Sequence, residues 1–314
     1  MPRWPQRDPD SAGSRGGRPL TEAERIGRRN GTREASRHAD VRRARTRRDR
    51  PRDPHERQVP FEERKRLALD DLATYRAVSF RDLSDARFGG NDFAARRGIS
   101  QMHEAGLVVR GKGWGPRGRP FLILAATASG VRAAARRGPA EQRRWHGLVK
   151  PSEAHHDTAV YRAAREKIAE LVEEGFTVRR IRIDAELKSE LAKAAERARA
   201  EGGPEAARIA QHRVARELGL PVSDGRVHVP DVQIEFERPA EADGPEPGRA
   251  NIEVVTASYK DRAIRAKAAM GFHLSASGSA ALRKMRAALG GDRIDFGETE
   301  GRGGGRNPDA ELEF

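Results

Sequence analysis

The chain has 314 residues, of which 34% are charged and only 5% aromatic, and its formal net charge is +14. The absence of cysteine excludes disulfides, thiolate metal sites and a cysteine nucleophile. No apolar run approaches the roughly 20 residues that span a bilayer, and the first residues lack the apolar segment of a signal peptide. The sequence therefore predicts a cytoplasmic protein with no membrane contact.

The positive charge is concentrated in the first half of the chain. Residues 1–60 contain 17 Lys or Arg and 9 Asp or Glu, and residues 61–150 contain 18 and 9. Residues 151–314 contain 26 and 29. A basic half beside a nearly neutral half favours a polyanionic partner for the basic half, and double-stranded DNA is the partner that we expect.

The first segment, residues 1–58, is rich in Arg, Pro, Gly, Ser and Asp and has almost no large apolar side chains. That composition is typical of disordered chain, because it offers too little apolar surface to bury. The cations are densest in residues 41–50. We predict a disordered basic arm that neutralises DNA phosphates; a solvated tail that aids solubility is the alternative.

Residues 59–138 have the pattern of a winged helix-turn-helix. Apolar spacing predicts a first helix over 61–75, and Ser79 and Asn91 are placed to cap a short second helix and a third helix over 92–104. We expect Phe93, Ile99 and Met102 on the buried face of the third helix. A strand over 107–111, a basic turn over 112–119, a strand over 121–124 and a helix over 128–137, capped by Thr127, complete the module.

A module of this kind reads DNA with its third helix in the major groove, while cations on the hairpin contact phosphates or the minor groove. Some winged helices bind only protein, and the net positive charge argues against that alternative here. The expected DNA contacts are the polar and cationic residues of the third helix and of the hairpin: Asn91, Arg96, Arg97, Gln101, Lys112, Arg117 and Arg119.

After a linker over 139–151, residues 152–290 are expected to form an α/β domain, followed by a loose tail over 291–314. A polar hairpin loop is expected over 238–250. An irregularity is expected at Arg179-Arg180 in the first strand, and Gly202-Gly203-Pro204 separates two helices. The expected helices are 152–174, 185–200, 205–218, 259–270 and 278–289, and the expected strands are 176–184, 227–237, 251–256 and 272–275.

Two acidic residues stand out in this second half. Alternation places Asp231 and Glu253 on one face of two adjacent strands, with Pro230 before the first of them. Two such carboxylates can hold Mg²⁺, which prefers oxygen ligands. A bound divalent ion can polarise a phosphate and activate water, and a nearby lysine can stabilise the developing charge.

On Pro230, Asp231 and Glu253 the chain resembles the PD-(D/E)xK nuclease-like superfamily, which implies a restriction-endonuclease-like fold and a Mg²⁺ site. That pattern has a lysine two residues after the glutamate, whereas this chain has Val255. Lysines in other positions are known in the superfamily, so Lys260 or Lys267 is expected to supply the charge. Further candidate metal ligands are Glu166, Glu170, His155 and His156.

The whole arrangement resembles the replication-relaxation family, in which a winged helix precedes a degenerate nuclease-like domain. The similarity covers about residues 60–290 and rests on the Ala154-His-His-Asp opening of a helix, on Glu253-Val-Val-Thr256 and on the following Tyr259-Lys260. Members are encoded on plasmids and other mobile elements, so the resemblance implies partners in plasmid replication or mobilisation.

The sequence thus predicts an α+β protein that acts as a DNA-binding accessory protein of a mobile element. One alternative is a Mg²⁺-dependent nuclease whose catalytic residues would be Asp231, Glu253 and Lys260. A second is a winged-helix transcription regulator whose second half binds a partner or forms a homodimer.

Overall fold

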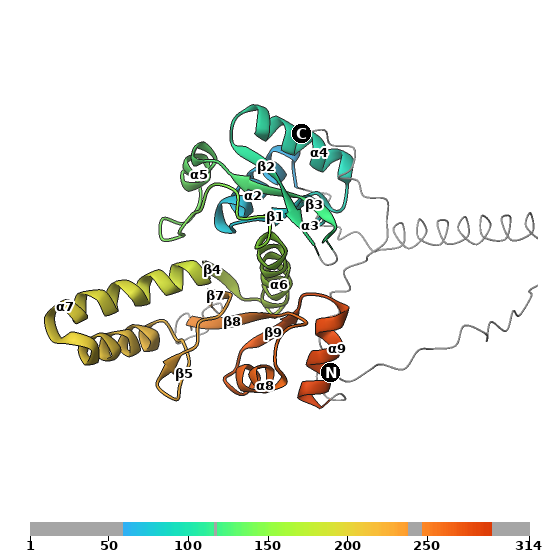
Figure 1. Ribbon diagram of the computed structural model, residues 1–314. Helices are drawn as coiled ribbons and strands as arrows, with labels where there is room; N and C mark the ends of the chain where they lie inside the picture. The colour runs from blue at the N-terminus through green and yellow to red at the C-terminus, as the bar shows by residue number, and fades with distance from the viewer. Residues whose placement is uncertain (1–58, 116–117, 238–246, 291–314) are drawn as a thin grey trace, which may run out of the picture. The chain divides into compact units, whose positions relative to one another are not determined.

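The computed structural model describes residues 59–115, 118–237 and 247–290, and within these ranges the chain has a mixed α+β fold (Figure 1). The expected basic arm, the expected tail over 291–314 and the candidate DNA contact Arg117 lie outside the described residues.

In the first half, the described residues form four helices and one small sheet. The elements in chain order are α2 (Phe61–Thr74), β1 (Val78–Ser79), α3 (Phe80–Phe88), α4 (Asp92–Glu104), β2 (Val108–Trp114), β3 (Pro120–Ala126) and α5 (Ala128–Ala135). Strand β3 lies between β1 and β2 and is antiparallel to both, with Val78 opposite Leu124 and Gly111 opposite Ile123. The hairpin β2–β3 directly follows α4.

The expected caps of these helices are confirmed. Side-chain oxygens of Ser79, Asn91 and Thr127 accept hydrogen bonds from the backbone N–H groups of Asp82, Ala94 and Gly130, at 3.0, 3.1 and 3.0 Å. Each bond satisfies one of the amide groups that a helix leaves without a partner in its first turn. Between α3 and α4 the chain reverses through two glycines with φ of 61° and 70°, a conformation that other residues rarely adopt.

Several details of the first half differ from expectation. Strand β2 continues to Trp114, into the basic turn expected over 112–119. Phe93 was expected in the core and is instead 79% exposed. Ala95, Gly98, Ile99 and Met102 are the buried residues of α4, and Phe93 lies six residues before Ile99, so the helical period turns it toward solvent. The short strand β1 was not expected, because two residues are too few to show an alternating pattern.

The second half is built on a mixed sheet of strands in the order β4-β7-β8-β9. Strands β4, β7 and β8 are antiparallel neighbours, and β9 pairs with β8 in parallel. The expected irregularity is confirmed as a bulge between Val178 and Arg180. The elements are α6 (Ala154–Glu173), β4 (Thr177–Ile183), α7 (Asp184–Glu217), β5 (Val222–Ser223), β6 (Arg226–Val227), β7 (Val232–Glu237), β8 (Pro247–Val255), α8 (Asp261–Ala269), β9 (His273–Ala276) and α9 (Ser279–Leu289).

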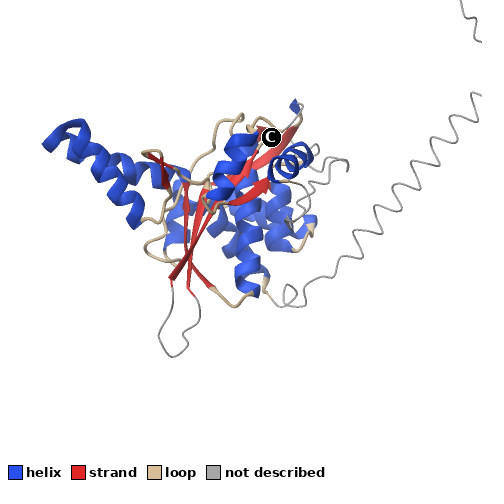
Figure 2. Cartoon of the chain, turned by 90° about the horizontal axis from the view of Figure 1, so that it is seen from below, coloured by secondary structure: helices blue, strands red, loops and turns tan. Residues whose placement is uncertain are grey.

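Strand β8 begins at Pro247, four residues before the start that the sequence suggested, so the expected loop over 238–250 is shorter. Helix α7 contains non-helical residues at Gly202 and Gly203, which confirms a break between two helices at this point. Leu187 and Leu191 before the break share an apolar cluster with Leu218 and Leu220 after it, so the two parts fold back on each other. Figure 2 shows this helical pair extending from the end of the sheet.

Helix α6 connects the two halves. Its first residue, Ala154, packs on the β2–β3 hairpin so closely that a Cβ on Gly113 would lie 2.9 Å from the Cβ of Ala154. Its remaining length contacts β4, β7 and β8, and Figure 1 shows it between the two sheets. One apolar cluster includes Leu72 and Phe88 of the first half together with Ile234 and Ile252 of the second.

The segment 139–151, expected to be a linker, is packed against both halves. The N–H of Trp145 donates to the carbonyl of Ala73 at 2.6 Å. The side-chain amide of Gln142 bonds both to the carbonyl and to the N–H of Ile181, at 2.8 and 2.9 Å, in the manner of a neighbouring strand. In the described part of the chain, no helix combines the length and the apolar character that crossing a membrane requires.

Candidate functional site

The candidate nucleic-acid surface begins with the outer face of α4. Phe93, Arg97, Ser100 and Glu104 follow one another at helical spacing, opposite the buried residues of the helix. Arg97 is exposed, and its guanidinium lies over the ring of Phe61 at 5.3 Å. Ser100 Oγ accepts a hydrogen bond from Arg110 of β2 at 2.9 Å, which joins this face to the hairpin.

The hairpin β2–β3 carries the next group of cations. Lys112 and Arg119 are both exposed, and Lys112 Nζ lies 5.9 Å from the ring of Trp114, which is itself 45% exposed. Within the described ranges, neither Arg97 nor Arg119 pairs with a carboxylate. These two charges are therefore available to an external anion.

The other expected DNA contacts have partners within the protein. Asn91 is exposed, but its side-chain carbonyl caps α4. Arg96 is half-buried with its guanidinium 5.4 Å from the ring centre of Phe80. Gln101 Oε1 accepts from Lys65 Nζ at 2.8 Å. The side chains of Asn91, Arg96 and Gln101 are therefore engaged in contacts within the protein.

A second candidate site surrounds the two expected carboxylates, at the edge of the sheet where β7 begins and β8 ends. Val232 is opposite Ile252 in the sheet, and the N–H of Asp231 donates to the carbonyl of Ile252 at 3.0 Å. Asp231 is therefore adjacent to Glu253, as the sequence suggested, and the two charges act on each other: Asp231 contributes to raising the pKa of Glu253.

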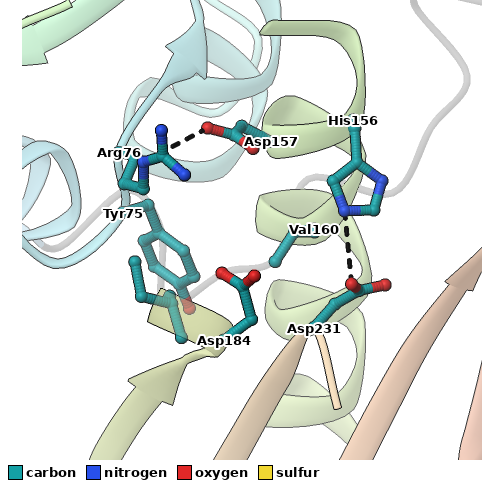
Figure 3. Close-up of a pocket in the computed structure, with 8 residues that line it drawn as sticks. Tyr75, Arg76, His156, Asp157, Val160, Asp184 and Asp231 are labelled. Atoms are coloured by element: carbon teal, nitrogen blue, oxygen red, sulfur yellow. Dashed lines mark ion pairs between the residues drawn. The ribbon is translucent and has the colours of Figure 1, made fainter. Parts of the chain in front are cut away.

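Both oxygens of Asp231 are engaged by protein donors. The N–H of Val254 donates to Oδ2 at 2.8 Å, and His156 Nε2 on α6 lies 3.2 Å from Oδ1 (Figure 3). The hydrogen bond to Asp231 raises the pKa of His156, against the opposing effect of burial. The contact between His156 and Asp231 thus joins α6 to the residue that precedes β7.

Glu253 is buried, with 4% of its surface exposed, and is held by two residues that follow it in the chain. The Tyr259 hydroxyl donates to Oε1 at 2.5 Å, and Lys267 Nζ on α8 lies 2.9 Å from Oε2. Burial is the main cause that raises the pKa of Glu253, and it outweighs the lowering effects of Tyr259 and Lys267. Lys267 also lies 4.2 Å from the ring centre of Phe272.

Of the two lysines proposed for this site, the structure places Lys267 beside Glu253, whereas Lys260 is exposed at the N-cap of α8. Glu166 and Glu170 lie ten and fourteen residues after His156 on α6, about 15 and 21 Å farther along the helix axis. Glu170 pairs instead with Lys167 at 2.7 Å. The structure therefore does not bring these glutamates to Asp231.

A small pocket of about 20 Å³, enough for an ordered water, lies beside the His156–Asp231 pair. Figure 3 shows Asp157, Asp184 and Asp231 around it, with Arg76 directed at Asp157. Arg76 Nε is 3.8 Å from Asp157 Oδ2, too far for a good hydrogen bond. Burial raises the pKa of Asp157 to about 6, and Arg76 only partly opposes the shift.

Replacing Asp157 with Asn should therefore stabilise the protein near neutral pH. The pKa of Asp157 is above its ordinary value of 3.8 in the folded state, so the folded protein holds this proton more tightly, and stability falls as pH rises through about 6. Because Asn does not ionise, we expect the variant's advantage to grow between pH 4 and 6 and to reach about 1 to 3 kcal/mol above pH 7.

Urea unfolding of both proteins at several pH values measures this difference, and the subtraction cancels most contributions of other groups. A stability difference between the two proteins that stays constant from pH 4 to 8 would contradict a raised pKa for Asp157.

The residues around Asp231 and Glu253 do not fit a preassembled Mg²⁺ site. All four carboxylate oxygens have protein donors within 3.2 Å, and one of those donors is the ammonium of Lys267. The described residues hold no group of three or more His, Asp or Glu arranged to bind a metal ion, so His155 and His156 do not complete one. The arrangement is a hydrogen-bonded cluster that joins β7, β8, α6 and α8.

Sequence reasoning named Lys267 and His156 among its candidates but did not single out Arg76 or Asp157, which line the small pocket. Lys267 lies three residues after the buried Ile264, and this spacing is a signal that it faces the sheet, whereas Lys260 precedes the helix. The spacing of Phe93 from Ile99 is likewise the signal that turns its ring outward. The contact of His156 with Asp231 joins residues 75 positions apart, and no local pattern indicates it.

No protein-family model, curated protein or solved structure matches this chain.

Proposed function

We propose that this protein binds double-stranded DNA through α4 and the β2–β3 hairpin, as an accessory protein of a plasmid or other mobile element in replication or mobilisation. Three helices followed by a hairpin, with β3 between β1 and β2, support a winged helix-turn-helix in the first half. The mixed sheet with Asp231 and Glu253 on adjacent strands supports a nuclease-like fold in the second half. The mobile-element role rests on the resemblance alone.

The observation that carries the proposal is the distribution of charge. Residues 61–104, which include α2, α3 and α4, contain 8 Lys or Arg and 8 Asp or Glu. Residues 105–138 contain 7 Lys or Arg and no Asp or Glu. The excess positive charge of residues 61–138 therefore comes from the hairpin, from α5 and from the two arginines that follow α5. The hairpin lies beside the outer face of α4, where Arg110 bonds to Ser100.

A salt titration of binding to a labelled 30-base-pair duplex tests this proposal. Cations that neutralise phosphates release condensed counterions, so the logarithm of the binding constant falls linearly with the logarithm of salt concentration. For about four neutralised phosphates we expect an affinity loss of about 100-fold between 50 and 200 mM salt. Absence of binding at 50 mM salt, or binding independent of salt, would contradict the proposal.

The nuclease alternative is favoured by one observation: Lys267 places a positive charge beside Glu253, where the sequence has Val255 instead of the expected lysine. The engaged oxygens of both carboxylates argue against it. Incubating supercoiled plasmid with the protein and Mg²⁺ or Mn²⁺ decides between the two. We expect no nicking; nicking that Lys267→Ala abolishes and Lys260→Ala leaves unchanged would establish the nuclease.

A further inference from the structure

Phe93 is the most exposed of the large apolar side chains that the structure describes, at 79%. It is the second residue of α4 and follows the capping residue Asn91 by two positions. A single exposed apolar residue is common on protein surfaces and needs no function. The place of Phe93 on α4 is the observation that indicates a function.

Phe93 lies at the N-terminal end of the outer face of α4. Arg97 and Ser100, at four and seven residues from it, continue the same line, and the buried residues Ala95, Gly98 and Ile99 lie on the opposite side. The N-terminal residues of a recognition helix are those that approach the base edges in the major groove. Phe93 is the one large apolar side chain of α4 on that outer line.

The cationic residues near Phe93 indicate which kind of partner binds over its ring. Arg97 is one turn farther along α4, Arg110 reaches Ser100 from β2, and Lys112 and Arg119 extend along the hairpin. An apolar protein partner would have to bury these cations at a high cost in desolvation, whereas a polyanion pairs with them. In the major groove the apolar group that a phenyl ring can contact is the C5-methyl of thymine.

We infer that Phe93 contacts a thymine methyl in the major groove and thereby gives the protein a preference for a thymine at one position of its site. This inference rests on the proposed function, because it assigns a role to one side chain within that DNA-binding surface. In this arrangement Arg97 and the cations of the hairpin bind the DNA phosphates, and Phe93 distinguishes thymine from the other bases.

The test uses the full chain and duplexes that differ only in the methyl group. Duplexes that the protein enriches from a random 20-base-pair pool are synthesised with thymidine and with deoxyuridine, which pairs identically but lacks the methyl. We expect the wild type to bind the deoxyuridine duplex about fourfold more weakly for one buried methyl. Phe93→Ala should bind the thymidine duplex more weakly and bind both duplexes equally.

The matched control is Ile209→Ala, which removes another exposed apolar side chain, 59% exposed on α7, and should keep the fourfold ratio. Because both side chains are exposed, neither variant should lose stability, and a thermal melt of each variant tests this. Duplex binding with equal affinity for thymidine and deoxyuridine, a ratio that survives in Phe93→Ala, or enriched duplexes without a thymine in common would each overturn the inference alone. Failure to bind any duplex would overturn the proposed function as well.

Discussion

Replacing Asp71 with Asn is expected to lower the free energy of unfolding by about 3 kcal/mol, because it leaves the largely buried guanidinium of Arg87 without its counter-charge. Asp71 is 6% exposed and accepts two hydrogen bonds from Arg87, both at 2.6 Å. It also accepts from the Tyr161 hydroxyl at 2.6 Å. Burial is the largest single influence on the pKa of Arg87 and lowers it, but the charge of Asp71, its hydrogen bonds to Arg87 and the nearby tyrosines together raise the pKa above its ordinary value, so the guanidinium stays charged.

The three residues come from α2, α3 and α6, so their network holds the first half of the protein to the helix that supports the second sheet. Tyr161 also packs edge-on against Tyr75, with the ring centres 5.0 Å apart. We therefore expect Asp71→Asn to loosen both halves together and to lower the melting temperature in a single transition.

Urea unfolding followed by circular dichroism measures the loss. The control is Glu63→Gln, which removes one charge of the solvent-accessible Glu63–Arg66 pair of the same helix and should leave stability nearly unchanged. Equal losses in the two variants would contradict a buried network, and so would two separate transitions in the wild type.

Reversing the charges of Lys112 and Arg119 together is expected to weaken DNA binding by about 100-fold or more at 50 mM salt. Each cation that neutralises one phosphate contributes about 0.9 to the slope of the logarithm of affinity against the logarithm of salt. Removing two should flatten the slope by about 2, and the introduced carboxylates repel the backbone in addition. Fluorescence anisotropy with a labelled duplex at four salt concentrations measures affinity and slope together.

The matched control is Arg197→Glu combined with Arg199→Glu, which makes the same change in net charge on the exposed surface of α7. If affinity depends only on the overall charge of the protein, both double variants lose it equally. If the hairpin contacts DNA, only the double variant at Lys112 and Arg119 loses affinity and shows a flatter dependence on salt.

Local sequence patterns predicted most of the helices and strands. Ser79, Asn91 and Thr127 begin helices because each has a side-chain oxygen in reach of the N–H three residues later. The pair Gly202-Gly203 ends one helix and allows the chain to reverse. These signals act within a few residues, which is why the sequence reveals them.

Long-range contacts were beyond such patterns. Nothing local indicates that Tyr161 donates to Asp71, 90 residues away, or that Gln142 pairs with the backbone of Ile181 and so ties the expected linker to the sheet. At the acidic site, alternation placed Asp231 and Glu253 side by side, but two of the donors that surround them, His156 and Lys267, come from α6 and α8. Those donors are what argue against an open metal site.

The measurement that tests the proposed DNA surface most directly is amide hydrogen exchange of the full chain with and without a saturating 30-base-pair duplex, read by mass spectrometry. We predict slower exchange in peptides covering Asp92–Glu104 and Val108–Ala126, and unchanged exchange in those covering Asp261–Ala269 and Ser279–Leu289. Protection confined to α8 and α9, with α4 and the hairpin unaffected, would contradict the account.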